Sequence, residues 1–226
     1  MSEDPHSIRE ALTPEPIVTE VKGSIVVVRL NRPAQRNPLS RDTLQELKRI
    51  LSALIDDEAI EAIIITGTDD VFASGADIRE LSELDPPAAL EFSKLGQDLF
   101  QTIADARQMT IAAINGYCMG GGLDLALACD LRLASKAAVF AHPGVRLGII
   151  TGWGGTHRLP RIIGRGRALE FFATARKYNS DEARASGLVS YIADPVLELA
   201  LGFAAAKIEG GGVSATFFQT LSKLNS

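Results

Sequence analysis

The chain has 226 residues, 46% of them hydrophobic, and a net charge of −5. This length suffices for one domain with a well-buried core and a smaller appendage. The acidic balance disfavours a nucleic-acid partner, although it is compatible with a local basic patch. Residues 1–16 are polar and contain three prolines. We therefore expect a disordered lead-in there, and neither a signal peptide nor a membrane-spanning segment.

The two cysteines, Cys118 and Cys129, lack the paired spacing of a metal site. They are expected to be free, buried thiols, because cysteine is among the most buried residue types. Free thiols suit a reducing compartment, so a cytoplasmic location is predicted.

The N-terminal half predicts alternating strands and helices. Ile17–Val21 and Ser24–Leu30 form a β-hairpin pattern around Lys22-Gly23. Ser40 is a helix N-cap, and leucines at helical spacing continue to Asp56. A buried strand over Ala62–Thr66 and helical segments from Asp77 to Ala106, interrupted at Pro86-Pro87, follow.

The second half begins with a strand over Thr110–Asn115 and a helix after Gly122. This alternation indicates parallel α/β units. Beyond Phe140 the pattern becomes mostly helical, with candidate helices at Ala168–Ala175, Ser180–Ala185 and Pro195–Ile208. Gly210–Gly212 then breaks the pattern, and Val213–Leu224 provides at most one more helix.

A glycine run, Gly120–Gly122, joins the Thr110–Asn115 strand to an apolar helix. Glycines have no side chains to keep a ligand from the backbone, so their N–H groups can point at an incoming oxygen. Asp124 is the only charged residue between Met119 and Cys129. A buried carboxylate is costly without a partner, which favours a role in a cavity or at the helix N-terminus.

A second segment of this kind follows the strand Ala62–Thr66. Small residues lead into Asp69–Glu80 and place further N–H donors near Ala76. Donors from two loops can bind one carbonyl oxygen, so the pair of loops indicates an oxyanion site.

Several short motifs occur in the order found in the enoyl-CoA hydratase/isomerase (crotonase) family, which the chain resembles from about residue 17 to about residue 208. They are Asn31–Pro33 with Asn37–Leu39, Phe72–Ile78, Ile114–Tyr117 with Gly120–Gly122, Gly154–Pro160, and Ala185–Val189. The resemblance implies an α/β fold of the crotonase (Clp protease-like) type, a spiral of ββα units over residues 17–190. Residues 191–226 would form a helical segment shorter than is usual for the family.

The resemblance also implies an acyl-CoA enzyme that stabilises a thioester enolate. Its oxyanion donors would be the backbone N–H groups of Ala76 and Gly121. Residues 76–79 (Ala76, Asp77, Ile78 and Arg79) would lie along the pantetheine arm of coenzyme A, with Asp77 more suited to capping a helix than to chemistry. Arg36, in the loop Gln35–Asn37 near the nucleotide end, could bind a phosphate or simply be a solvated surface arginine.

Asp124 matches the position where hydratases commonly have a catalytic glutamate. Gly144 stands where they place the second one, and no carboxylate occurs between Asp130 and Glu170. Hydration normally uses two carboxylates, so this lone carboxylate predicts a poor hydratase. His142, two residues from Gly144, is a candidate base or anion anchor, or a purely structural imidazole.

Three alternatives to hydration or isomerisation stay open. The chain could bind acyl-CoA with little or no turnover, could catalyse a different crotonase-family reaction, or could use Ser74 as a hydrolase, which lacks the G-x-S-x-G context. The family resemblance implies no metal or redox cofactor beyond the CoA of the substrate. It also implies a homotrimer or hexamer, in which a neighbour would cover the apolar region Val196–Phe218.

Overall fold

The computed structural model describes residues 15–208. The expected glycine break at Gly210–Gly212 and the last expected helix, Val213–Leu224, lie outside the described residues, as does nearly all of the expected lead-in. Within residues 15–208, no helix is both long enough and apolar enough to cross a bilayer.

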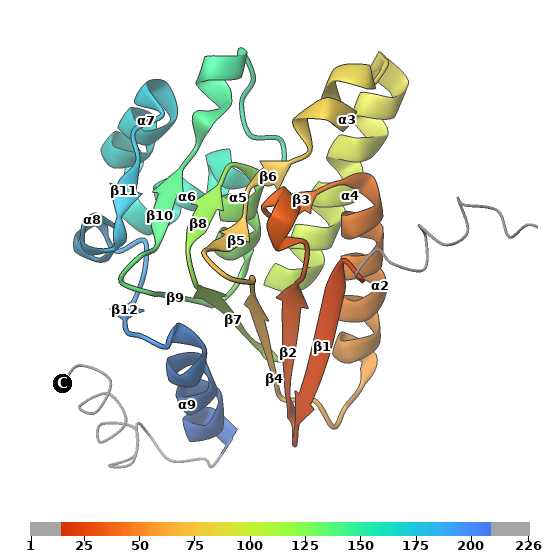
Figure 1. The fold of residues 1–226 in the computed structure, drawn as a ribbon, viewed down its shortest axis with the longest axis vertical. Helices are drawn as coiled ribbons and strands as arrows, with labels where there is room; N and C mark the ends of the chain where they lie inside the picture. The colour runs from red at the N-terminus through yellow and green to blue at the C-terminus, as the bar shows by residue number, and fades with distance from the viewer. Residues whose placement is uncertain (1–14, 209–226) are drawn as a thin grey trace, which may run out of the picture.

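The larger sheet has six strands in the order β1-β2-β4-β7-β9-β12 (Figure 1). The hairpin of β1 and β2 is antiparallel, and every further neighbour pairs in parallel. The predicted hairpin and the predicted strands at Ala62–Thr66 and Thr110–Asn115 are confirmed, the last as Met109–Ile114. β2, β4 and β7 are runs of mainly Ile, Val and Ala buried on both faces, as is typical of strands with parallel neighbours. The bounds are β1 Ile17–Lys22, β2 Ile25–Leu30, β4 Ala62–Thr66, β7 Met109–Ile114, β9 Leu131–Ala134 and β12 Tyr191–Ile192.

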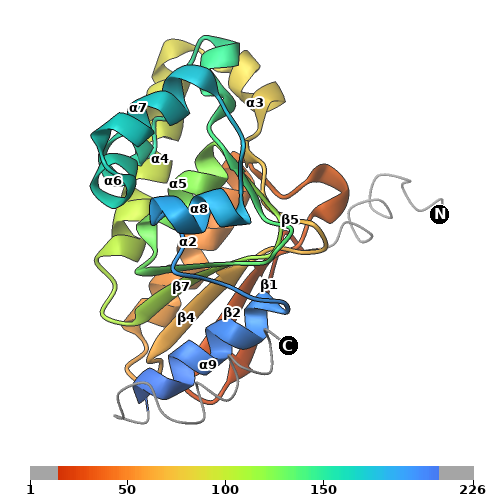
Figure 2. The same cartoon turned by 90° about the vertical axis from the view of Figure 1, so that its left-hand side faces the viewer.

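The two faces of this sheet bury different residues, as the two-residue period of a strand requires. Ile63 and Ile65 join the main core, whereas Ile64 faces the helix α9 (Val196–Ile208). Figure 2 shows α9 along one side of the sheet, opposite α2 and α4. We expected the apolar residues from Val196 onward to need a neighbouring chain. That expectation is wrong for the described part, since Leu199 and Ala204 pack on this chain's own sheet.

A second sheet has the order β11-β10-β8-β5, and β3 pairs with β6 in a third. None of these strands was predicted, because they are only two or three residues long and give no periodic signal. β6 contains Ala76, and β8 directly precedes the glycine run Gly120–Gly122. Their bounds are β3 Pro38–Leu39, β5 Val71–Ala73, β6 Gly75–Ala76, β8 Tyr117–Met119, β10 Val139–Ala141 and β11 Tyr178–Asn179.

Two helices begin at the polar caps that the sequence predicts. The Ser40 hydroxyl accepts from the N–H of Thr43 at the start of α2, and Asp77 accepts from Arg79 and Glu80 at the start of α3, so both predicted caps are confirmed. The interruption expected at Pro86-Pro87 is confirmed, because α3 ends at Glu83 and the two prolines begin a new helix, α4, where a missing N–H costs nothing. The bounds are α2 Arg41–Asp56, α3 Ile78–Glu83, α4 Pro86–Ala104, α5 Gly121–Ala128, α6 Gly155–Ile163, α7 Arg165–Thr174, α8 Ser180–Ser186 and α9 Val196–Ile208, with 3-10 turns η1 Pro33–Gln35 and η2 Pro143–Leu147.

Candidate active site

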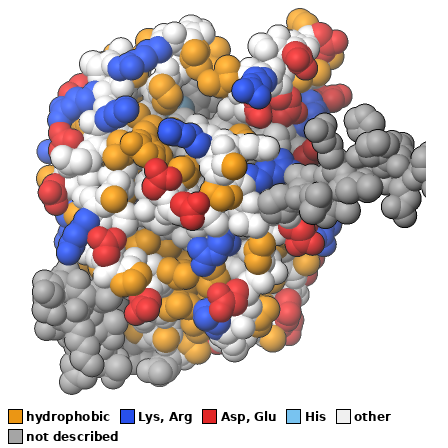
Figure 3. All heavy atoms as spheres, in the orientation of Figure 1, with side chains coloured by type: hydrophobic (Ala, Val, Ile, Leu, Met, Phe, Trp, Pro, Cys, Tyr) orange, Lys and Arg blue, Asp and Glu red, His pale blue; other side chains and the backbone are white. Residues whose placement is uncertain are grey.

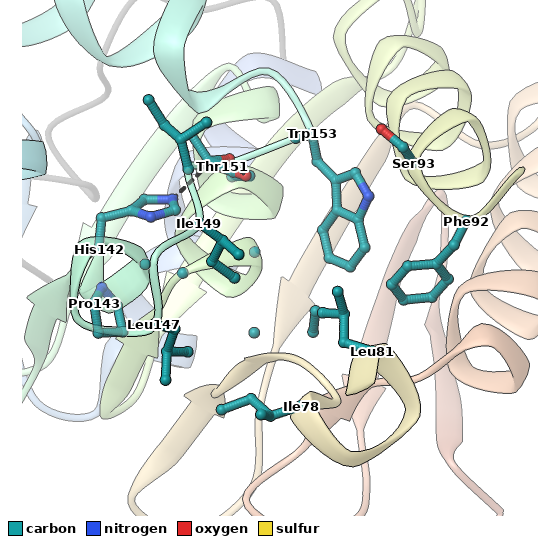
Figure 4. A pocket seen from close by; sticks show the side chains of 18 of the residues that line it. Ile78, Leu81, Phe92, Ser93, His142, Pro143, Leu147, Ile149, Thr151 and Trp153 are labelled. Atoms are coloured by element: carbon teal, nitrogen blue, oxygen red, sulfur yellow. Dashed lines mark hydrogen bonds and ion pairs between the residues drawn. The ribbon is translucent and has the colours of Figure 1, made fainter. Parts of the chain in front are cut away.

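A largely apolar cavity of about 270 Å³ opens where the parallel strands β5 and β8 end. The carboxyl ends of parallel strands are the usual place for ligands in α/β sheets. Figure 4 shows His142 and Thr151 on one side of this cavity, and Trp153 and Phe92 on the other. The walls between them are aliphatic, contributed chiefly by Ile78, Leu81, Leu84, Leu147, Ile149 and Ile150.

Two glycine-containing turns meet at the bottom of the cavity. β8 ends at Met119 and α5 begins at Gly121; Gly120 between them has a φ of 52° and a ψ of −123°, which strongly favour glycine. The other turn holds Gly75 at φ 98° before Ala76. A Cβ added to Gly75 would lie 3.1 Å from the Gly121 nitrogen, and one added to Gly121 would lie 3.4 Å from the Ala76 nitrogen. The two predicted oxyanion donors, Ala76 and Gly121, are therefore neighbours and line one cavity.

Asp124 lies in the first turn of α5 and lines the same cavity, although its side chain is only 1% exposed. One carboxylate oxygen, Oδ1, is 3.1 Å from His142 Nε2, and the other, Oδ2, accepts a hydrogen bond from the Thr151 hydroxyl. The start of α6 also abuts it, because a Cβ on Gly155 would overlap Oδ1. A buried carboxylate thus has two hydrogen-bonding partners and a helix N-terminus beside it, which offsets its desolvation.

His142 is likewise buried, at 5% side-chain exposure, and its ring packs edge-on against Phe172 at a centroid distance of 5.2 Å. The sequence left its role open between a base, an anion anchor and a structural imidazole. The structure pairs it with Asp124, a contact between residues 18 positions apart that no local pattern reveals.

Gly144 lines the cavity, but there is little room for a side chain at this position. The carbonyl oxygen of Ile149 lies 2.6 Å from where a Cβ on Gly144 would be, and the Ile149 N–H donates to the Gly144 carbonyl. A glutamate could not enter at position 144 without moving this loop. The expected lone carboxylate does have a titratable partner in the structure, because His142 contacts Asp124.

Trp153 and Thr151 are cavity residues that sequence reasoning assigned no role. The Trp153 indole lies between Phe92 and Phe100, at centroid distances of 5.3 and 5.6 Å. Gly96 of α4 and Gly121 of α5 make room for it, since a Cβ on either would lie 2.6 Å from an indole carbon. These contacts join residues more than 25 positions apart, which single-sequence patterns do not encode.

A second, more polar pocket adjoins the cavity and shares Ser74, Ala76 and Ile78 with it. Gln35, Arg36, Asp77 and Arg79 line this pocket, so the structure groups the residues that the resemblance assigns to coenzyme A. Arg36 also lies over the ring of Tyr117, 5.7 Å from its centroid. Asn37 of the same loop is buried instead, where its side-chain amide donates to the carbonyls of Val71 and Phe72.

The parallel strands and the glycine-bounded apolar cavity at their carboxyl ends define an α/β fold with an enzyme-like ligand site, and comparison with known proteins identifies the family. The enoyl-CoA hydratase/isomerase family model matches residues 20–208. The crotonyl-CoA hydratase of Syntrophomonas wolfei subsp. wolfei is 44% identical over 182 residues, covering 80% of this chain and 70% of that protein. The short-chain-enoyl-CoA hydratase of Clostridium acetobutylicum is 38% identical over 180 residues, covering 79% and 69%.

Solved structures agree in fold. The enoyl-CoA hydratase from Bacillus anthracis superimposes with a TM-score of 0.83 at 35% identity, covering 88% of this chain and 78% of that one. Pseudomonas aeruginosa DspI gives a TM-score of 0.83 at 32% identity, covering 89% and 83%. The chain therefore belongs to the enoyl-CoA hydratase/isomerase family, with the predicted crotonase fold, and is an acyl-CoA enzyme of hydratase/isomerase type.

Within residues 15–208, no cluster of three or more His, Cys, Asp or Glu side chains is placed to hold a metal ion.

Proposed function

We propose that the enzyme adds water to the double bond of an enoyl-CoA thioester through an enolate held between Ala76 and Gly121. The thioester oxygen would accept from the two backbone N–H groups, which favour the negative charge that develops on it. Single donors of an oxyanion hole contribute about 3–4 kcal/mol to transition-state stabilisation. Asp124 would transfer the proton at the α-carbon.

The observation that carries this proposal is the position of Asp124 relative to the paired donor loops. Asp124 follows Gly121 by one turn of α5, and both face the same apolar cavity. An oxygen bound at Gly121 therefore places the adjacent α-carbon toward Asp124. The aliphatic cavity walls suit the rest of an acyl chain.

The coenzyme A portion is assigned to the adjoining polar pocket. Arg36 and Arg79 are exposed there, and both can supply charge-assisted hydrogen bonds to phosphate. Because the two pockets share Ala76 and Ile78, a pantetheine arm in one pocket would lead its thioester to the donor loops in the other.

No metal or redox cofactor takes part in this proposal, since two N–H donors and a proton-transferring side chain suffice for enolate chemistry. A cytoplasmic location is supported by two unpaired, buried cysteines. Acyl-CoA binding without turnover is the alternative that the sequence left open. No observation in the described residues favours it.

Gly121→Ala tests the oxyanion assignment, because its methyl group would lie beside the Ala76 N–H. We expect crotonyl-CoA hydration to fall about 10²–10³-fold. The methyl would also clash with the Trp153 indole. The matched variants are therefore Trp153→Phe, which relieves that clash, and the double variant that combines Gly121→Ala with Trp153→Phe. The double variant should stay impaired while Trp153→Phe alone retains most activity. Wild-type turnover in Gly121→Ala would contradict the assignment.

A further inference from the structure

Asp124 and His142 form a buried, hydrogen-bonded pair in the wall of the cavity. The reaction proposed above uses only the carboxylate of this pair. Their side chains are 1% and 5% exposed, and Oδ1 lies 3.1 Å from Nε2. The Thr151 hydroxyl donates a hydrogen bond to the other carboxylate oxygen, Oδ2, so Oδ1 is the oxygen that faces the imidazole. The imidazole is thus the one titratable side chain hydrogen-bonded to Asp124 among the described residues.

We propose that His142 is a catalytic residue that accepts the proton of the attacking water, in the role that a second carboxylate plays in two-carboxylate hydratases. This inference rests on the proposed function and deepens it. Its geometric basis is that Gly121, Asp124 and His142 line one cavity, with Asp124 one turn along α5 from Gly121 and His142 directly after β10. Because Oδ1 of Asp124 lies 3.1 Å from Nε2 of His142, an acyl group bound at Gly121 with its α-carbon at Asp124 would have its β-carbon within reach of the imidazole.

In the proposed cycle the pair starts with one proton shared between Oδ1 and Nε2, and the imidazole carries its other proton on Nδ1. As the water oxygen bonds to the β-carbon and loses a proton to Nε2, the π electron pair of the double bond moves into the thioester and forms the enolate. The enolate α-carbon then takes the proton from Oδ1, which forms the new C–H bond. Finally, Nε2 returns a proton to Oδ1 along the 3.1 Å hydrogen bond. One water is added and both side chains regain their starting protonation.

The same arrangement explains why Gly144 is tolerated. The space beside it is closed by the Ile149 carbonyl, so the second proton-handling group must come from another position. His142 lies two residues away, lines the cavity, and packs against the Phe172 ring. An imidazole can both accept and release a proton near neutral pH.

His142→Gln tests the proposal, because glutamine can still donate a hydrogen bond to Asp124 but cannot carry the proton. Two rates are measured: hydration of crotonyl-CoA, and exchange of the α-protons of the saturated thioester butyryl-CoA in D₂O. We expect hydration to fall about 10²–10⁴-fold, with α-proton exchange retained. His157→Gln, an exposed histidine on α6, is the matched control and should leave both rates unchanged.

His142→Ala separates proton transfer from positioning. If glutamine restored hydration relative to alanine, His142 would merely hold Asp124, and the proposal would be overturned. Wild-type hydration in a folded His142→Gln or His142→Asn variant would overturn it equally. A wild-type protein that neither exchanges the α-protons nor binds butyryl-CoA would instead overturn the proposed function itself.

Discussion

Single residues in this protein are placed by contacts that reach far along the chain, and Asp124 is the clearest case. Its apolar helix predicts that the carboxylate must have a partner, but the identity of the partners is not encoded nearby. His142 and Thr151 lie in the segment after β10, 18 and 27 positions from Asp124 in the sequence. Backbone N–H donors near Ala76 and in the Gly120–Gly122 run were predictable from strands followed by glycines, and the family resemblance selected Ala76 and Gly121 among them; their oxyanion role stays a prediction. Thr151 was not, because a lone threonine after two isoleucines carries no local signal.

The two cysteines provide a prediction about reactivity. Burial raises the pKa of Cys129 to about 12, and burial together with the nearby Asp124 carboxylate raises the pKa of Cys118 well above the usual thiol range. The thiolate is the reactive form, so both groups stay protonated and inaccessible in the folded protein up to mildly alkaline pH.

We therefore expect a thiol-reactive disulfide reagent to label neither cysteine in the native protein at pH 8, and to label both after denaturation. Absorbance of the released chromophore counts the thiols. Rapid labelling of either cysteine in the folded state would show that the α5 region opens, contrary to the packing described above.

At the scale of elements, long buried strands and capped helices follow from the sequence, whereas the short strands beside the site and the helix α6 do not. Ala62–Thr66 was predicted because five consecutive apolar or small residues favour a strand buried on both faces. β8 and β10 have three residues each, too few for a periodic pattern. The helix α6 was missed because Gly154, Gly155 and an internal Pro160 argue against a helix, yet close packing against Asp124 requires a glycine at its start.

That packing makes the first residue of α6 a sensitive position. A methyl group on Gly155 would overlap Asp124 Oδ1 and come within 2.9 Å of the Thr151 side chain. We expect Gly155→Ala to displace the carboxylate and lower hydration about 10²-fold, the usual cost of misplacing a catalytic group by about 1 Å.

Gly166→Ala is the matched control for this variant. Gly166 lies in α7 with nothing within 4 Å of an added Cβ, and alanine has the higher helix propensity. Activity and melting temperature should both be preserved there. If Gly155→Ala kept full activity, the carboxylate would not depend on this contact.

At the scale of the whole molecule, the surface near the cavity mouth is unusually apolar. Ile78, Val145, Leu147, Ile149 and Ile150 are all between 47% and 68% exposed. Figure 3 shows apolar side chains among charged ones on the upper part of one face. Exposed apolar clusters of this kind mark interaction or ligand-binding surfaces.

We expect this surface to be covered in a symmetric assembly, in keeping with the trimer or hexamer that the family resemblance implies. Light scattering coupled to size exclusion should report a mass of about three or six chains. A mass of one chain would contradict the expected assembly. The apolar surface near the cavity mouth would then serve substrate binding only.

The central claim is that Asp124 transfers the α-proton of a thioester held between the Ala76 and Gly121 N–H groups. The most direct test follows α-proton exchange of butyryl-CoA in D₂O by mass spectrometry, in the wild-type enzyme and in Asp124→Asn, with calorimetry of thioester binding alongside. The account predicts α-proton exchange in the wild type and an exchange rate about 10²–10⁴-fold lower in Asp124→Asn. The two proteins should bind the thioester with equal affinity. Exchange at the wild-type rate in a folded Asp124→Asn protein would contradict it.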